Sequence, residues 1–147
     1  MDMPATPPAQ PDPGDRPFSA APPLRVPGLP DDGPLTVLEA LAGAAWLVPA
    51  GAAVSYGGLA ALLGAGGARQ AGRAMAESPE GTPWWRVVRA DGSLPEALAV
   101  VAQRRWAAEG MPVRGGGTRI DLAAAGWQPD AQDLEALELL AARTRAG

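Results

Sequence analysis

The side chains of this chain that are suited to chemistry are arginines, tryptophans and one tyrosine. There is no cysteine and no histidine, and a reading of the sequence shows that all 12 basic residues are arginines. A thiolate nucleophile, a disulfide and the usual zinc site are therefore excluded. Two adjacent indoles, Trp84 and Trp85, offer flat aromatic surfaces instead. Pro83 precedes them and Arg86 follows, which makes this short stretch a candidate site, and we expect no metal and no cofactor.

The charge is unevenly distributed along the chain. The net charge is −4, yet residues 50–120 carry eight arginines against five acids, a local charge of +3. Contacts to phosphate depend on local charge, so the middle of the chain is a candidate DNA-binding face between two acidic ends. The alternative is an ordinary solvated arginine surface.

The N-terminal segment differs in composition from the rest. Residues 1–33 contain many prolines and few large apolar side chains, which predicts a disordered tail because little surface can be buried. There is no basic start with an apolar core as in a secretory signal, and no apolar run of the ~18 residues that a membrane span needs. We expect a cytoplasmic protein without membrane contact.

Hydrophobic spacing and capping residues predict a mostly α-helical fold. Two short helices joined by a glycine-containing turn, over 55–64 and 67–77, are typical of a helix-turn-helix. Apolar residues at 87–88 with the Asp91-Gly92 turn predict a strand that acts as a wing, and residues 112–113 with 118–122 predict a small hairpin. The other predicted helices cover 35–47, 96–108 and 130–145.

Seven short pieces of the chain resemble, in the same order, the C-terminal DNA-binding domain of the O6-alkylguanine-DNA alkyltransferases. The pieces are residues 48–51, 54–60, 68–75, 83 with 86–88, 91–92, 108–110 and 120–122. The family's Pro-Cys-His-Arg-Val segment has Trp84 at the position of the cysteine and Trp85 at that of the histidine. Within the family, the chain is most similar to the alkyltransferase-like proteins, which lack the reactive cysteine. The resemblance implies a winged helix-turn-helix-like domain over 34–128, between the 1–33 tail and an acidic helical extension at 129–147.

This resemblance assigns a DNA-binding role to several residues. Tyr56 would crowd the phosphate next to the target nucleotide and help to rotate it outward, and Arg69 would fill the space left in the base stack. Arg73, one turn further, would reach a phosphate. The small residues Ala68 and Gly72 suit a helix in the narrow minor groove. Ser55, a predicted helix N-cap, completes the expected DNA-binding surface.

The resemblance also predicts a lesion pocket formed by Pro83, Trp84, Trp85, Arg86 and Glu109. Trp84 would form an aromatic wall against the flipped guanine and its alkyl group. Glu109 matches the acid that ends a proton relay in active members. With indoles at the cysteine and histidine positions, its predicted role here is structural.

These assignments imply a non-enzymatic sensor of DNA damage. It would bind double-stranded DNA through the minor groove as a monomer, hold a flipped O6-alkylguanine and pass the complex to nucleotide excision repair proteins. One alternative is a winged-helix DNA-binding or regulatory protein without lesion recognition, in which Trp84 and Trp85 pack inward and close the pocket. Another is a protein-interaction module that uses the acidic ends.

Overall fold

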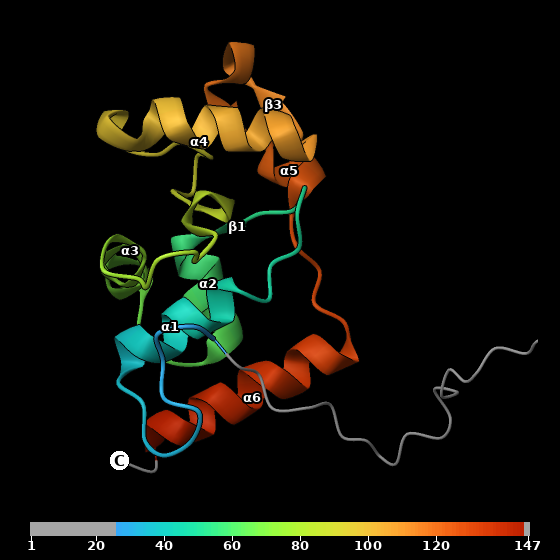
Figure 1. Ribbon diagram of the computed structural model, residues 1–147. Helices are drawn as coiled ribbons and strands as arrows, with labels where there is room; N and C mark the ends of the chain where they lie inside the picture. Colours follow the sequence, from blue (N-terminus) through green and yellow to red (C-terminus); the bar gives the residue numbers. More distant parts are fainter. Residues whose placement is uncertain (1–25, 146–147) are drawn as a thin grey trace, which may run out of the picture.

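Helices form most of the described part of the chain, residues 26–145, in the computed structural model (Figure 1). This confirms the mostly α-helical fold class. Most of the predicted tail, residues 1–25, lies outside the described residues. The helices are α1 (Val37–Ala45), α2 (Tyr56–Leu63), α3 (Ala68–Ala76), α4 (Glu96–Glu109), α5 (Leu122–Ala125) and α6 (Ala131–Arg145).

Local capping explains where the first two helices begin and end. At the start of α1 the Thr36 hydroxyl accepts a hydrogen bond from the backbone of Glu39, whose carboxylate accepts one from Thr36 in return. The Ser55 hydroxyl caps α2 by accepting from the Gly58 amide at 3.0 Å. Gly64 ends α2 with a φ of 78°, a left-handed conformation that favours glycine.

Two pairs of short strands lie between the helices along the chain. β1 (Val54–Ser55) pairs in parallel with β2 (Val87–Val88), and β3 (Val113–Arg114) pairs antiparallel with β4 (Arg119–Ile120). The hairpin predicted near residues 112–122 is therefore confirmed. The strand predicted at 87–88 and the turn at Asp91-Gly92 are confirmed, but both valines of β2 are fully buried beside β1, so this strand is not an exposed wing.

The apolar residues gather in two clusters. Leu41 of α1, Leu59 of α2 and Leu137 of α6 belong to the first, and Figure 1 shows α6 alongside α1 at the opposite end of the molecule from α4. Trp106 of α4 and Ile120 of β4 belong to the second. The side chains of Tyr56 and Trp84 pack against both clusters, and this junction forms the wall of a cavity.

The two ends of the described chain lie against each other. The Arg143 guanidinium of α6 donates hydrogen bonds to the carbonyl oxygens of Gly33 at 2.7 Å and Pro30 at 3.0 Å. Val26 is 6% exposed. Residues 26–33, which composition groups with the tail, are thus held against the helical domain by α6.

Candidate functional site

A cavity of about 660 Å³ lies between α2, α3, the loop after α3, and α4. The residues that line it come from all four of these segments and from the Trp84-Trp85 pair. They are Tyr56, Gly72, Met75, Ala76, Ser78, Pro79, Glu80, Gly81, Thr82, Trp84, Trp85, Pro95, Leu98 and Arg105. Volumes of roughly 300–1,000 Å³ are usual for small-molecule sites, so the cavity is large enough to hold a planar group.

Tyr56, at the start of α2, forms one wall together with α3. Its side chain is half-buried, and a Cβ atom added to Gly72 would lie 3.7 Å from the tyrosine ring. The ring therefore rests against the backbone of α3 at its glycine. Burial raises the pKa of Tyr56 above its ordinary value, although the nearby positive charge of Arg89 acts in the opposite direction. The phenol is a neutral hydrogen-bonding group at neutral pH.

The two tryptophans lie edge to face, with ring centroids 5.7 Å apart and an interplanar angle of 85°. Their surroundings differ. Trp84 is half-buried, and the more enclosed Trp85 is 9% exposed and belongs to the second apolar cluster. The guanidinium carbon of Arg105 lies 4.6 Å from the centroid of the Trp85 ring. Both indoles line the cavity, but Trp84 has the greater surface available to a ligand.

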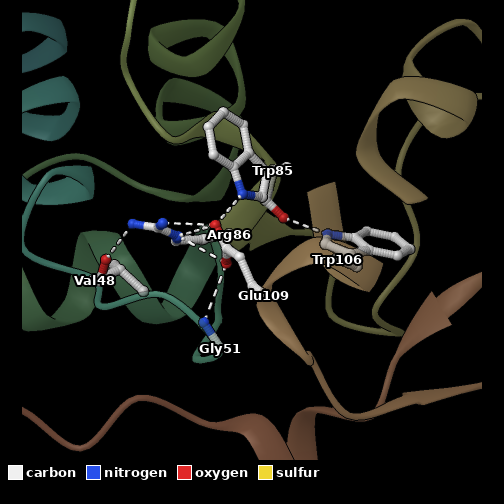
Figure 2. Close-up of polar contacts among 6 residues, drawn as sticks. All are labelled: Val48, Gly51, Trp85, Arg86, Trp106 and Glu109. Carbon is white, nitrogen blue, oxygen red and sulfur yellow. Dashed lines mark hydrogen bonds and ion pairs between the residues drawn. The ribbon is translucent and has the colours of Figure 1, made fainter. Parts of the chain in front are cut away.

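A partly buried ion pair between Arg86 and Glu109 lies beside Trp85, and Glu109 also binds the Trp85 indole (Figure 2). The Trp85 indole N–H donates to Glu109 Oε2 at 2.8 Å, and Arg86 Nη2 donates to the same oxygen at 2.6 Å. Arg86 Nε donates to both carboxylate oxygens at 3.1 Å, and the Gly51 amide donates to Oε1 at 3.1 Å. Arg86 Nη1 donates to the Val48 carbonyl at 2.9 Å. The carboxylate thereby ties α4 to the 83–86 segment and to the 48–51 loop.

These contacts set the ionisation of Glu109. Burial acts to raise its pKa, but the hydrogen bonds from Arg86, Trp85 and Gly51 and the charge of Arg86 outweigh burial. The pKa of Glu109 consequently lies below its ordinary value of 4.5, and the carboxylate is ionised at neutral pH.

The backbone of Trp85 is held by a second tryptophan of α4. The buried Trp106 indole donates to the Trp85 carbonyl at 2.7 Å (Figure 2).

Of the five residues predicted to form the lesion pocket, two line the cavity. Trp84 and Trp85 lie on its surface, whereas Pro83, Arg86 and Glu109 are not among the lining residues. Pro83 is buried, and the ion pair of Arg86 with Glu109 braces Trp85. These three residues shape the cavity through the residues that they hold.

The predicted DNA-binding residues occupy α2, α3 and the position before α2. Ala68 and Arg69 are exposed in the first turn of α3, and Gly72 lies against Tyr56. Arg73 is exposed and forms an ion pair with Glu77 at 2.8 Å, so a phosphate would have to compete with that carboxylate for it. Ser55 lies beside them as the cap of α2.

The loop after α3 also lines the cavity, and none of its residues is among the five predicted to form the lesion pocket. Thr82, 1% exposed, donates to the Pro79 carbonyl at 2.7 Å and accepts from the Trp46 indole at 3.1 Å. The Ser78 hydroxyl donates to the Met75 carbonyl at 2.8 Å and so anchors the loop to the end of α3. Arg105 of α4 was also missed, because only the packing of α4 brings it to Trp85.

Within residues 26–145 no group of three or more acidic, histidine or cysteine side chains is placed to hold a metal ion. No helix of this part of the chain is both long and apolar enough to cross a membrane.

Comparison with known proteins shows a family match and similarity to a solved structure. Residues 36–110 match the DNA-binding domain of 6-O-methylguanine DNA methyltransferase. The crystal structure of S. pombe Atl1 in complex with damaged DNA containing O6-carboxymethylguanine is similar, with a TM-score of 0.55 and 26% sequence identity. The likeness covers 63% of this chain and 95% of the S. pombe chain. No curated protein sequence matches significantly.

Proposed function

Because the chain belongs to the family defined by the DNA-binding domain of 6-O-methylguanine DNA methyltransferase, we propose that it recognises damaged DNA and holds an O6-alkylated guanine in the cavity beside Trp84. The S. pombe protein of similar structure is bound to DNA that contains O6-carboxymethylguanine, which supports this ligand class. The cavity is the main observation that supports the proposal, because the half-buried Trp84 indole and Tyr56 line it together at the edge of the helix-turn-helix.

In the proposed complex, α3 lies in the minor groove of the DNA. Ala68 and Gly72 give α3 a face without long side chains, which suits a groove about 6 Å wide. Tyr56 contacts the DNA phosphate next to the target nucleotide and crowds it. The exposed Arg69 enters the base stack in place of the extruded base. Extrusion costs a few kcal/mol of pairing and stacking, so groups that replace those contacts stabilise the flipped state.

Trp84 and Trp85 stand where catalytic members of the family have their cysteine and histidine, and the sequence contains no cysteine. An indole cannot accept an alkyl group as a thiolate does. The proposed function is therefore retention of the lesion without repair, with nucleotide excision repair proteins acting on the complex. We propose that the protein acts on DNA as a monomer.

A winged-helix protein without lesion recognition is the competing function. It requires both indoles to pack inward and close the pocket. Trp85 is packed among apolar residues, but Trp84 is half-buried on the wall of an open cavity, and this arrangement favours lesion binding.

The test compares short duplexes that differ only in one guanine, plain or O6-methylated, at matched salt. We expect tighter binding of the methylated duplex, and Trp84→Ala should remove most of this preference, because stacking of one base on an aromatic ring is worth about 1–3 kcal/mol. Tyr56→Ala and Arg69→Ala should weaken the preference as well. Leu139→Ala, at a site 55% exposed on α6, is the matched control. Equal affinities for the two duplexes across a salt series would refute lesion recognition.

A further inference from the structure

Arg105 is a cation on the cavity wall whose side chain is held by an aromatic ring. It lies on α4, is exposed to solvent, and its guanidinium carbon is 4.6 Å from the centroid of the Trp85 ring. A guanidinium stacked in this way keeps its N–H groups available for a planar acceptor.

The second guanidinium near Trp85 has a different environment. Arg86 lies 5.5 Å from the ring centroid, but it forms an ion pair with Glu109 in which the two side chains are only 17% and 12% exposed. The charge of Arg86 is therefore neutralised by a carboxylate of the protein itself. Among residues 26–145, no carboxylate forms an ion pair with Arg105.

The cavity lining contains one basic and one acidic side chain, Arg105 and Glu80. The net charge of the lining is thus zero, and any preference for a charged ligand depends on where the guanidinium lies. Arg105 is in contact with Trp85, the ring that meets Trp84 edge to face, so its charge is close to the proposed lesion-binding surface.

We propose that Arg105 makes the cavity select guanine adducts whose O6 substituent carries a carboxylate. This inference rests on the proposed function and identifies the class of lesion. A carboxylate on the adduct would accept hydrogen bonds from the Arg105 guanidinium in the planar, two-pronged geometry that arginine favours. A neutral alkyl group cannot make this contact and leaves the cation solvated.

The experiment uses four duplexes of one sequence, with plain guanine, O6-methylguanine, O6-carboxymethylguanine or its neutral amide, O6-carbamoylmethylguanine. The last two adducts have nearly the same size, so the ratio of their affinities isolates the charge. We expect the protein with residues 1–147 to bind the carboxymethyl duplex about tenfold more tightly than the amide duplex. This ratio is at the lower end of what a hydrogen bond between charged groups contributes, because the site is open to solvent. Arg105→Gln should bring this ratio close to one.

Arg104→Gln is the matched control, because Arg104 is the exposed neighbour on α4 but does not line the cavity. It removes the same charge and should leave the ratio unchanged. A ratio near one in the unmodified protein would overturn the proposal. So would an Arg105→Gln variant that binds all four duplexes more weakly by one factor, since that result identifies a phosphate contact. If the unmodified protein binds plain and damaged duplexes equally, the proposed function itself fails.

Discussion

Trp84 and Trp85 are adjacent residues with different physical surroundings. The indole N–H of Trp85 donates to Glu109 and its carbonyl accepts from Trp106, so these two groups have partners inside the protein. Trp84 is half-buried on the cavity wall. In the proposed function, Trp84 contacts the ligand and Trp85 supports the structure, and each role can be tested by its own substitution.

Trp85→Phe keeps a ring but removes the indole N–H that donates to the Glu109 carboxylate at 2.8 Å. We expect the free energy of unfolding to fall by about 1–3 kcal/mol, since hydrogen bonds to charged groups are worth more than neutral ones. Urea denaturation followed by circular dichroism measures the change. The preference for methylated over plain duplex should survive in this variant. An unchanged stability would contradict the bracing role that we assign to the contact.

Because the pKa of Glu109 is lowered in the folded protein, its contribution to stability is lost as the pH falls into the acidic range. At neutral pH the carboxylate is ionised in both the folded and the unfolded chain, and its contribution is fully present. As the pH falls below the ordinary value of 4.5, the unfolded chain binds the proton first, so this contribution is lost as the pH approaches the lower pKa of the folded state.

Glu109→Gln should therefore lose less stability between pH 6 and pH 3 than the unmodified protein does, when both are unfolded in urea at each pH. The glutamine can still accept hydrogen bonds from Arg86 and Trp85, so a folded variant is expected. Parallel stability curves for the two proteins over this range would show that Glu109 does not contribute to the acid dependence.

At the scale of elements, α3 connects the residues predicted to contact DNA with the cavity. Its first turn exposes Ala68 and Arg69, and one turn later Gly72 lies against Tyr56 of α2. Gly72 has no short contact that would exclude a methyl group, since an added Cβ atom would be 3.7 Å from the nearest tyrosine atom. A methyl group can thus be added at residue 72 without a large change in the fold, whereas a longer side chain would reach the tyrosine ring.

Gly72→Ala and Gly72→Leu form a matched pair. Alanine should stabilise the protein by about 0.5–1 kcal/mol, because glycine in a helix interior costs that much relative to alanine. It should leave DNA affinity nearly unchanged. Leucine should lower affinity for plain and methylated duplexes by about tenfold or more, because its longer side chain would displace the Tyr56 ring or fill the cavity beside it. Fluorescence anisotropy with labelled duplex measures both, and equal binding by the two variants would argue against a role for Tyr56 and this turn of α3 in DNA binding.

At the scale of the whole molecule, α6 is part of the folded domain. Leu137 and Leu140 of α6 belong to the first apolar cluster, and Arg143 bonds to the carbonyls of Pro30 and Gly33. The acidic helix predicted at 129–147 therefore covers α1 and α2 as well as carrying charge at its surface. No residue of α6 lines the cavity, so α6 supports the site without contacting it.

Leu137→Ala should lower the free energy of unfolding by about 2–5 kcal/mol, because the side chain is 1% exposed and its removal leaves a cavity in the core. Leu139→Ala, two residues away and 55% exposed, should change stability by less than about 0.5 kcal/mol. Thermal unfolding of the two variants distinguishes them. Similar melting temperatures would mean that α6 is not packed as described.

The sequence alone determined the features that depend on local chemistry. The Ser55 and Gly64 signals predicted the limits of α2, and the absence of cysteine excluded a thiolate at the position of Trp84. Tertiary structure decided what depends on residues distant in the chain. Val87 and Val88 had the pattern of a wing strand, but their partner is a strand more than thirty residues earlier, and their burial is set by that pairing. The packing of α4 places Arg105 on Trp85 and Glu109 beneath it, because contacts between side chains on separate elements have no periodicity that the sequence could display.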